Sequence, residues 1–211
     1  MPRAVLFDLD GTLVDSLQDI ADALNHVLGS EGLPTHPVET YRFHVGWGAD
    51  DLVRRVLPDE AKPRTEELLR AFRARYTAHL VDATAPYPGV HALLAELARR
   101  EVPIAVLSNK PEESVHRVVE TLFADVPFQV VRGAREGVPH KPDPTSVLEV
   151  AAAMGLEPGE CFYVGDTEID IQTGHAAGMV PVGVAWGFRP EKLGEAAHIL
   201  EAPSDLLPLL G

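Results

Sequence analysis

Cysteine and long apolar runs are almost absent from this chain of 211 residues. Its single cysteine, Cys161, excludes a disulfide within the chain, so a reducing compartment is the simplest expectation. No apolar stretch approaches the ~18 residues that a membrane-spanning helix needs, and the first apolar run stops at Asp8, too early for a signal peptide. We therefore expect a cytoplasmic protein with no membrane contacts, in which Cys161 is a buried structural thiol.

Positive charge is also scarce. Lysine and arginine number 18 against 32 aspartates and glutamates, which gives a formal net charge of −14. This balance argues against nucleic acid as a partner, because binding a phosphate backbone needs a basic face. A small phosphate remains possible, since a metal ion and a lysine can reverse the field locally. With 45% hydrophobic residues, the chain has the composition of a globular protein with a sizeable core.

The most informative segment is the end of the first expected strand. Ala4–Phe7 is an apolar run typical of a buried strand, and Asp8, Asp10, Gly11 and Thr12 follow it. Open α/β proteins place their sites at this carboxyl edge of the sheet. The two-residue period of a strand predicts that Asp8 and Asp10 face the same ligand. Because two adjacent carboxylates repel unless a cation shares them, the segment predicts a metal site.

After this strand the apolar pattern changes to the helical period. It predicts helices over residues 17–28, 38–44, 49–57 and 65–80. A linker stiffened by two prolines covers 82–89. Residues 16–85 are therefore predicted to form an all-helical domain above the carboxyl edge of the sheet, with hinges near 13–17 and 82–88.

From residue 86 onward, strands and helices alternate. Strands are expected at 103–107, 128–131, 161–164 and 180–185, with a short edge strand at 198–200. Helices are expected at 90–100, after Pro111, at 144–154 and at 169–177, with a last helical turn in the tail. This alternation predicts an α/β fold, a Rossmann-like parallel sheet with helices on both faces. Residues 1–15 and 86–211 would form this core, and 16–85 the inserted domain.

Three further polar loops follow expected strands. Ser108 and Asn109 come after one strand and open a helix, which suits an anion. Lys141 follows the next strand, and Asp166 and Asp170 follow the one after it. Parallel topology brings such loops to one edge, and this set of groups suits phosphoryl transfer with Mg²⁺. No G-x-G-x-x-G or P-loop follows the first strand, which argues against hydride transfer and P-loop chemistry.

These segments resemble, in order, the four motifs of the haloacid dehalogenase superfamily. The resemblance covers the whole chain, and the helical insertion is similar to that superfamily's cap domain. The matching segments are Asp8-Leu9-Asp10-Gly11-Thr12, Ser108-Asn109, Lys141-Pro142, and Gly165-Asp166 with Asp170.

The resemblance implies a role for each of these residues. Asp8 would be the nucleophile that forms an aspartyl-phosphate. Asp10 would protonate the leaving group and then activate water, while its backbone carbonyl reaches the metal. Lys141 would neutralise charge between Asp8 and the phosphate. Asp166 would bind Mg²⁺ directly, so that Asp8, Asp10 and Asp166 form the metal set, and Asp170 would hold metal-bound water or orient Lys141.

Thr12, Ser108 and Asn109 would contact the phosphoryl group. Plainer interpretations stay open for several of these residues. Thr12 could only form the turn, Asp170 could only be an acid in the first turn of a helix, and Lys141 could be a surface charge. Asp10 could likewise only cap a turn.

Asp10 also narrows the reaction, because the resemblance implies that members acting on carbon–halogen bonds or phosphonates lack this second aspartate. Phe43–Ala49 and Ser108–Pro111 are further similar to segments of phosphoglycolate phosphatases. The expected function is a Mg²⁺-dependent phosphomonoester hydrolase acting on a small phosphorylated metabolite, 2-phosphoglycolate first. Alternatives are a phosphatase for a nucleotide, a sugar phosphate or pyrophosphate, a β-phosphoglucomutase-like mutase, and a non-catalytic binding module.

Cations near the site could bind a substrate carboxylate. Lys110 and Arg42 are the candidates, against the alternatives of a surface cation and a solvated helix face. Gly46 and Gly48 are interpreted as a turn between helices rather than as substrate contacts. Residues 186–189 could line the rim of the pocket or only pack. The sequence leaves the oligomeric state open between monomer and homodimer.

Overall fold

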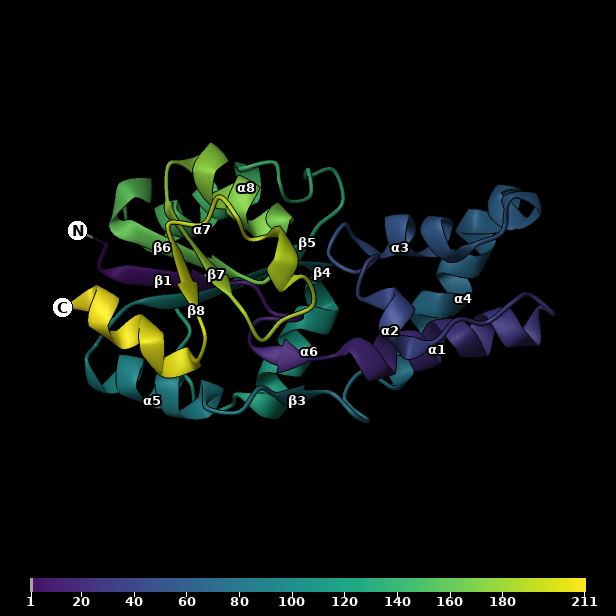
Figure 1. Ribbon diagram of the computed structural model, residues 1–211, viewed down its shortest axis with the longest axis horizontal. Coiled ribbons are helices and arrows are strands. Elements are labelled where there is room, and N and C mark those ends of the chain that lie inside the picture. Colours follow the sequence, from purple (N-terminus) through teal and green to yellow (C-terminus); the bar gives the residue numbers. More distant parts are fainter. Residues whose placement is uncertain (1) are drawn as a thin grey trace.

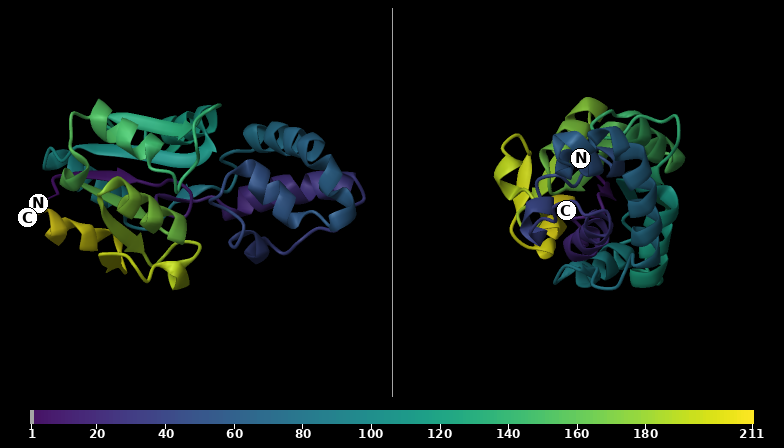
Figure 2. Two further views of the ribbon diagram at one scale, coloured as in Figure 1. Left: turned by 90° about the horizontal axis from the view of Figure 1, so that it is seen from above. Right: turned by 90° about the vertical axis from the view of Figure 1, so that its right-hand side faces the viewer.

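The computed structural model describes residues 2–211, which form two lobes joined by two crossings of the chain (Figures 1 and 2). Four helices with their connecting segments make up one lobe, which we call the cap lobe. A parallel sheet and its flanking helices make up the other, the sheet lobe. The helices of the cap lobe are α1 (Leu17–Ser30), α2 (Val38–Tyr41), α3 (Ala49–Val56) and α4 (Thr65–Ala78), with the short 3₁₀ helix η1 (Asp59–Arg64) before α4.

The sheet lobe contains six parallel strands in the order β5-β4-β1-β6-β7-β8. This is the doubly wound order, in which the chain starts at the centre and builds first one side and then the other. The central strand therefore ends at the point where such sheets place their ligands. The strands are β1 (Ala4–Phe7), β4 (Ile104–Pro111), β5 (Val130–Ala134), β6 (Cys161–Gly165), β7 (Val180–Val184) and β8 (His198–Leu200).

Helices cover both faces of this sheet, as predicted (Figure 1). The central strand is buried on both sides, with Val5 and Phe7 in one apolar cluster and Ala4 and Leu6 in the other. A strand buried on both faces is apolar throughout, which explains the uninterrupted run that begins the chain. The covering helices are α5 (Val90–Arg99) and α6 (Glu112–Leu122) on the first face, and α7 (Thr145–Ala153) and α8 (Glu168–Ala177) on the second.

The expected elements are confirmed with small shifts. The strand expected at 103–107 continues to Pro111, so the helix after it begins at Glu112 rather than at the proline. The strand expected at 128–131 lies at 130–134. The tail ends in a 3₁₀ helix, η4 (Pro203–Leu210), with two more short 3₁₀ turns at η2 (Pro158–Glu160) and η3 (Pro190–Lys192). Cys161 is buried in β6, as expected.

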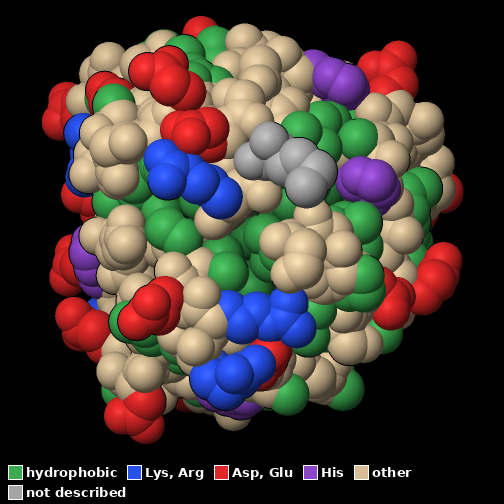
Figure 3. Space-filling model, turned by 90° about the vertical axis from the view of Figure 1, so that its left-hand side faces the viewer, with side chains coloured by type: hydrophobic (Ala, Val, Ile, Leu, Met, Phe, Trp, Pro, Cys, Tyr) green, Lys and Arg blue, Asp and Glu red, His purple; other side chains and the backbone are tan. Residues whose placement is uncertain are grey.

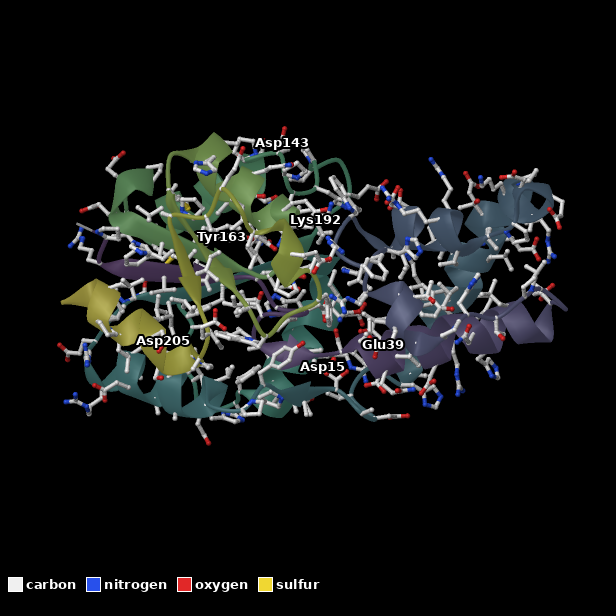
Figure 4. The ribbon with its side chains drawn as sticks, viewed as in Figure 1. Asp15, Glu39, Asp143, Tyr163, Lys192 and Asp205 are labelled. Atoms are coloured by element: carbon white, nitrogen blue, oxygen red, sulfur yellow. The ribbon has the colours of Figure 1, made fainter. Side chains whose placement is uncertain are left out.

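The linker between the lobes holds a feature that the sequence did not predict. β2 (Val14–Asp15) and β3 (Ala85–Pro86) pair as a short antiparallel ribbon where the chain leaves and re-enters the sheet lobe, and Asp15 marks this junction in Figure 4. The buried Asp19 carboxylate accepts hydrogen bonds from the backbone N–H groups of Ala83 and Thr84. The start of α1 is therefore fastened to the returning segment.

The end of the sheet lobe that faces away from the cap lobe carries acidic and basic side chains interspersed with other types (Figure 3). Among residues 2–211, every helix is too short or too polar to cross a lipid bilayer. The division of the chain at residues 15/16 and 85/86 stays a prediction.

Candidate active site

Three buried aspartates meet at the carboxyl edge of the sheet. Asp8 follows β1, Asp166 follows β6, and Asp170 lies in the first turn of α8. Each offers a carboxylate oxygen within 4.8 Å of the oxygens of the other two. Oxygen ligands of this kind suit a hard divalent cation such as Mg²⁺.

Glycines make room for this group. A Cβ atom on Gly11 or on Gly187 would overlap the Asp166 side chain, and Gly11 also has a φ of +87° that disfavours other residues. Asp166 accepts a hydrogen bond from the Phe188 N–H at 2.7 Å, and the Thr12 hydroxyl lies 3.4 Å from its other oxygen. The carboxylate is therefore held from both sides at a position that only glycine neighbours allow.

Negative charge is in excess at this site, because three aspartates lie close to a single cation, Lys141. Burial raises the pKa of Asp8 to about 7, with Lys141 acting against the shift and Asp170 adding to it. Burial, together with Asp170 and Asp8, raises the pKa of Asp166 well above its ordinary value. A divalent cation would reverse both effects by favouring the ionised carboxylates. The residues present therefore fit the metal that the sequence predicts.

Lys141 joins two of these acids. Its Nζ lies 2.9 Å from Asp8 Oδ1 and 2.7 Å from Asp170 Oδ1, and its side chain is only 3% exposed. The alternative of a surface charge is therefore wrong. Asp170 combines two of its expected roles, because Oδ1 binds Lys141 while Oδ2 accepts from the Thr167 hydroxyl and N–H at the start of α8.

Asp10 lies apart from the three clustered acids and has its own cation. Lys110 Nζ donates to both oxygens of Asp10, at 2.7 and 2.9 Å, and to the Tyr76 hydroxyl at 2.6 Å. The Ser16 hydroxyl donates to Asp10 Oδ1 at 2.6 Å. Burial alone would lower the pKa of Lys110, but Asp10 and Tyr76 outweigh it and raise the pKa. The interpretation of Lys110 as a surface cation is wrong, because its side chain is 3% exposed.

Asn109 connects three segments of the site. Its Nδ2 donates to the Gly46 carbonyl at 2.8 Å and to the Lys141 carbonyl at 3.1 Å, while its Oδ1 accepts from the Lys141 N–H at 2.9 Å. Ser108 accepts from the Lys110 N–H through its hydroxyl oxygen at 3.2 Å. The Asn109 side chain therefore positions the Lys141 loop and the turn from the cap lobe. Ser108 lines a cavity between the two lobes.

The turn at Gly46 and Gly48 docks on the sheet lobe. Both glycines have φ above +95°, and a Cβ on Gly46 would lie 2.9 Å from Ile169 Cδ1. The prediction of a turn is confirmed, with a close approach to the sheet lobe added to it. Both glycines also lie at the cavity between the lobes, so the absence of a substrate contact stays a prediction.

Two arginines cross between the lobes in opposite directions, an arrangement that we call the arginine clasp. Arg42 Nε of the cap lobe donates to the Phe188 carbonyl at 2.8 Å. Arg189 Nη1 of the sheet lobe donates to the carbonyls of Arg42 and Val45 at 2.8 and 2.6 Å. The expectation that Arg42 binds a substrate carboxylate is wrong on this geometry, because its guanidinium is committed to the sheet lobe outside the cavity. Trp186 packs, donating to the Thr12 carbonyl at 3.0 Å, instead of lining the cavity.

A cavity of about 270 Å³ lies between the lobes. The sheet lobe supplies its charged floor, and the cap lobe supplies a mainly apolar wall. The floor includes Asp8, Asp10, Ser108, Asn109, Lys110 and Lys141, and the wall includes Val45, Leu52, Phe72, Arg73 and Tyr76. The sequence indicates no role for Tyr76, and it marks Arg189 only as part of a segment at the rim or in the packing. Neither stands in a motif, and each acts through a contact with the other lobe.

Comparisons with known proteins show what this chain is similar to. A curated phosphoglycolate phosphatase of Aquifex aeolicus is 35% identical over 99% of this chain and 96% of its own length. One from Pseudomonas putida is 35% identical over 99% of this chain and 79% of its own length. A solved structure from Lactobacillus delbrueckii subsp. bulgaricus, provisionally named phosphoglycolate phosphatase, has a TM-score of 0.92 at 30% identity and covers 99% of this chain and 98% of its own.

More distant structures share the fold. A haloacid dehalogenase-like family hydrolase of Streptococcus pneumoniae has a TM-score of 0.89 at 23% identity, covering 100% of this chain and 99% of its own. The family model described as haloacid dehalogenase-like hydrolase matches residues 5–184, a span that includes the cap lobe, most of the sheet lobe and all four motifs. The chain belongs to the haloacid dehalogenase-like hydrolase family.

Proposed function

We propose that this enzyme is a Mg²⁺-dependent phosphomonoesterase that works through an aspartyl-phosphate on Asp8, with 2-phosphoglycolate as its substrate. The observation that carries the proposal is the position of Asp8. Its carboxylate lines the cavity and pairs with the buried Lys141. It also lies close enough to the carboxylates of Asp166 and Asp170 for one metal ion to bind among them. The names of the curated relatives support the same substrate.

The residues of the floor provide each part of the reaction. One Asp8 oxygen attacks phosphorus while Lys141 balances the negative charge that gathers there. As the ester P–O bond breaks, Asp10 gives its proton to the departing oxygen, and later takes a proton from the water that cleaves the Asp8–phosphorus bond. Mg²⁺ would be held by Asp8, Asp166 and the backbone carbonyl of Asp10, with Asp170 beside them to orient Lys141, and it would offset the charge of the phosphoryl oxygens.

The carboxylate of 2-phosphoglycolate needs a cation that is not already paired. Among the cations that line the cavity, Lys141 is matched by Asp8 and Asp170, and Lys110 by Asp10. Arg73, an exposed residue of α4, lines the cavity, and among residues 2–211 no side-chain hydrogen bond or ion pair engages it. We therefore assign the substrate carboxylate to Arg73 in place of Lys110 and Arg42.

A pair of esters tests this assignment. Wild-type enzyme and Arg73→Gln would be assayed with Mg²⁺ on 2-phosphoglycolate and on 2-hydroxyethyl phosphate, which lacks the carboxylate. A charged hydrogen bond contributes about 1.5–3 kcal/mol, so KM for phosphoglycolate should rise roughly 10- to 100-fold while the second ester changes little. Arg70→Gln is the control, since Arg70 is exposed on the same helix outside the cavity.

Other outcomes would revise the proposal at different levels. Preference for nucleotides, sugar phosphates or pyrophosphate would reject the substrate and keep the phosphatase. A requirement for a sugar bisphosphate with little phosphate release would indicate a mutase instead.

A further inference from the structure

We propose that Lys110, anchored by Tyr76 of the cap lobe, is a positioning residue that holds Asp10 for proton transfer to the leaving group. The inference rests on the proposed function and deepens it, because it makes protonation of the leaving group depend on docking of the cap lobe. Lys110 itself does not touch the reacting atoms.

The hydrogen bonds of the Lys110 ammonium carry the first step. An ammonium has three donors, and here all three find acceptors within 3 Å: the two oxygens of Asp10 and the Tyr76 hydroxyl. Ser16 donates to the same Asp10 carboxylate from the other direction. The carboxylate is therefore fixed on two sides, and both of its oxygens have a defined place in the floor of the cavity.

Burial makes this arrangement sensitive to the loss of one partner. The side chains of Lys110 and Asp10 are 3% and 11% exposed. A buried ion pair is stabilising only when its remaining donors and acceptors are satisfied. Because the Tyr76 hydroxyl accepts the third donor, its removal leaves a buried ammonium proton without a partner.

The local backbone explains how Lys110 reaches the site. Pairing between β4 and β5 is regular up to Leu107 and shifts register before Pro111. A register irregularity re-aims side chains that would otherwise alternate between the two faces of the sheet. As a result Ser108, Asn109 and Lys110 all line the cavity, although they are consecutive.

Tyr76 is held firmly within the cap lobe. Its ring stacks on Phe72 with centroids 5.5 Å apart and an interplanar angle of 7°. Lys110 Nζ lies 4.8 Å from the centroid of the Tyr76 ring. The hydroxyl consequently moves with α4, and separation of the lobes would remove it from Lys110.

The chemical consequence concerns one proton. In the first step Asp10 enters protonated; the Asp8–phosphorus bond forms, the ester P–O bond breaks, and the proton of Asp10 passes to the departing oxygen. This leaves Asp10 as the carboxylate that Lys110 and Ser16 hold in this structure. An alkoxide is a poor leaving group and needs this proton, whereas p-nitrophenolate leaves without it. Disturbing the Lys110–Tyr76 contact should therefore affect alkyl esters selectively.

The experiment compares kcat/KM for 2-phosphoglycolate and for p-nitrophenyl phosphate, because kcat/KM reports the steps up to the first phosphoryl transfer. General acid catalysis contributes about 10²–10⁴-fold. We expect Lys110→Met to lose roughly 100-fold and Tyr76→Phe roughly 10-fold on the alkyl ester, with losses below about threefold on the aryl ester. Lys110→Arg should recover part of the loss.

The matched control is Tyr41→Phe. Tyr41 is also a buried tyrosine of the cap lobe, but its hydroxyl donates to Asn25 Oδ1 at 2.7 Å, away from the cavity. This variant should show no difference between the two esters. Thermal unfolding of each variant separates loss of fold from loss of positioning.

The outcomes separate the inference from the function on which it rests. If the wild-type enzyme releases phosphate from neither ester with Mg²⁺ present, the proposed function fails. If the wild-type enzyme is active but Tyr76→Phe and Lys110→Met reduce both esters by the same factor, or neither ester, the positioning role is overturned.

Discussion

The cavity has two buried lysines, and they are held in different ways. Around Lys141 every charged partner, Asp8 and Asp170, comes from the sheet lobe. Around Lys110 one acceptor is Asp10 of the sheet lobe and the other is Tyr76 of the cap lobe. On the proposed mechanism, this difference means that attack on phosphorus depends on one lobe, whereas protonation of the leaving group depends on two.

This difference follows from how the two lobes are built. The sheet lobe fixes its loops through parallel strands that are buried on both faces, so the ends of β1 and β6 have little freedom. The cap lobe is a set of amphipathic helices that contacts the sheet lobe through the arginine clasp, the Gly46 turn and single side chains. Its contribution can therefore vary with docking.

The largest expected effect comes from the Lys141 side of the cavity. Asp8→Asn should lower turnover of every phosphate ester at least about 10³-fold, because the amide cannot act as the nucleophile. Release of inorganic phosphate would be measured on alkyl and aryl esters alike. Asp59→Asn, at an exposed residue of the cap lobe, is the control and should behave as wild type. Residual activity of Asp8→Asn above this limit would contradict the assignment.

The second prediction concerns the space around Asp166, which an added methyl group would fill. In Gly187→Ala the added methyl group would overlap the Asp166 side chain and the Gly11 carbonyl, so the carboxylate must shift. We expect a loss of about 10- to 100-fold in Mg²⁺ affinity or activity, as is usual when the support of a metal ligand is altered. Gly194→Ala is the control, since nothing lies within 4 Å of its added methyl group. Equal behaviour of the two variants, in a titration with Mg²⁺, would argue against the proposed metal position.

The third prediction concerns stability without metal. The folded-state pKa of Asp8 lies at about 7, above its ordinary 3.8, so its protonated form stabilises the fold at low pH and this contribution is lost as the pH rises from about 4 to about 7. One pKa unit corresponds to about 1.4 kcal/mol, which makes the loss on the order of 2–4 kcal/mol.

In EDTA, the Tm of the wild type should therefore fall relative to that of Asp8→Asn by about 5–10 °C between pH 4.5 and pH 8. Saturating Mg²⁺ should restore the wild type at pH 8. A Tm difference that does not depend on pH would show that the acids are not forced together in the absence of metal.

The smallest effect is expected at the arginine clasp. Arg42→Met removes the hydrogen bond to the Phe188 carbonyl, which contributes about 0.5–1.5 kcal/mol to docking of the cap lobe. KM should rise about two- to tenfold for every ester, without the leaving-group dependence expected of Tyr76→Phe. Arg54→Met is a suitable control, because Arg54 is an exposed arginine of α3. If Arg42→Met lowered activity on alkyl esters selectively, the arginine clasp would act on the leaving group as the Lys110–Tyr76 contact does. The distinction between these two contacts would then be wrong.

Much of the fold could be predicted from the sequence because its signals are local. The apolar run Ala4–Phe7 and the helical period of residues 17–28 each indicate their element without knowledge of the rest of the chain. The acids at the ends of β1 and β6 could be placed together because the alternation of strands and helices predicts a parallel sheet, and parallel strands end at one edge. The bounds of β4 and β5 shifted by a few residues, and the helix expected over 38–44 ends at Tyr41.

The contacts between the lobes could not be predicted, because they join residues far apart in the sequence. The periodicity of helices and strands gives no information about such contacts. Tyr76 lies 34 residues before Lys110, and the stripe that predicts α4 marks it only as apolar. Arg42 follows α2 in the cap lobe, and its partner Phe188 follows β7 in the sheet lobe. The ribbon of β2 and β3 is two residues long on each side, too short to show an alternating pattern.

That ribbon has a consequence for how such a molecule can change over time. Its paired residues, Val14 with Pro86 and Asp15 with Ala85, bring the entrance and exit of the inserted segment side by side. An insertion whose two ends are neighbours places no strain on its host, which can keep its own register whatever is inserted. The helices above the cavity could therefore be replaced without altering the strands below, provided that the replacement again supplies an acceptor for Lys110 where Tyr76 now lies.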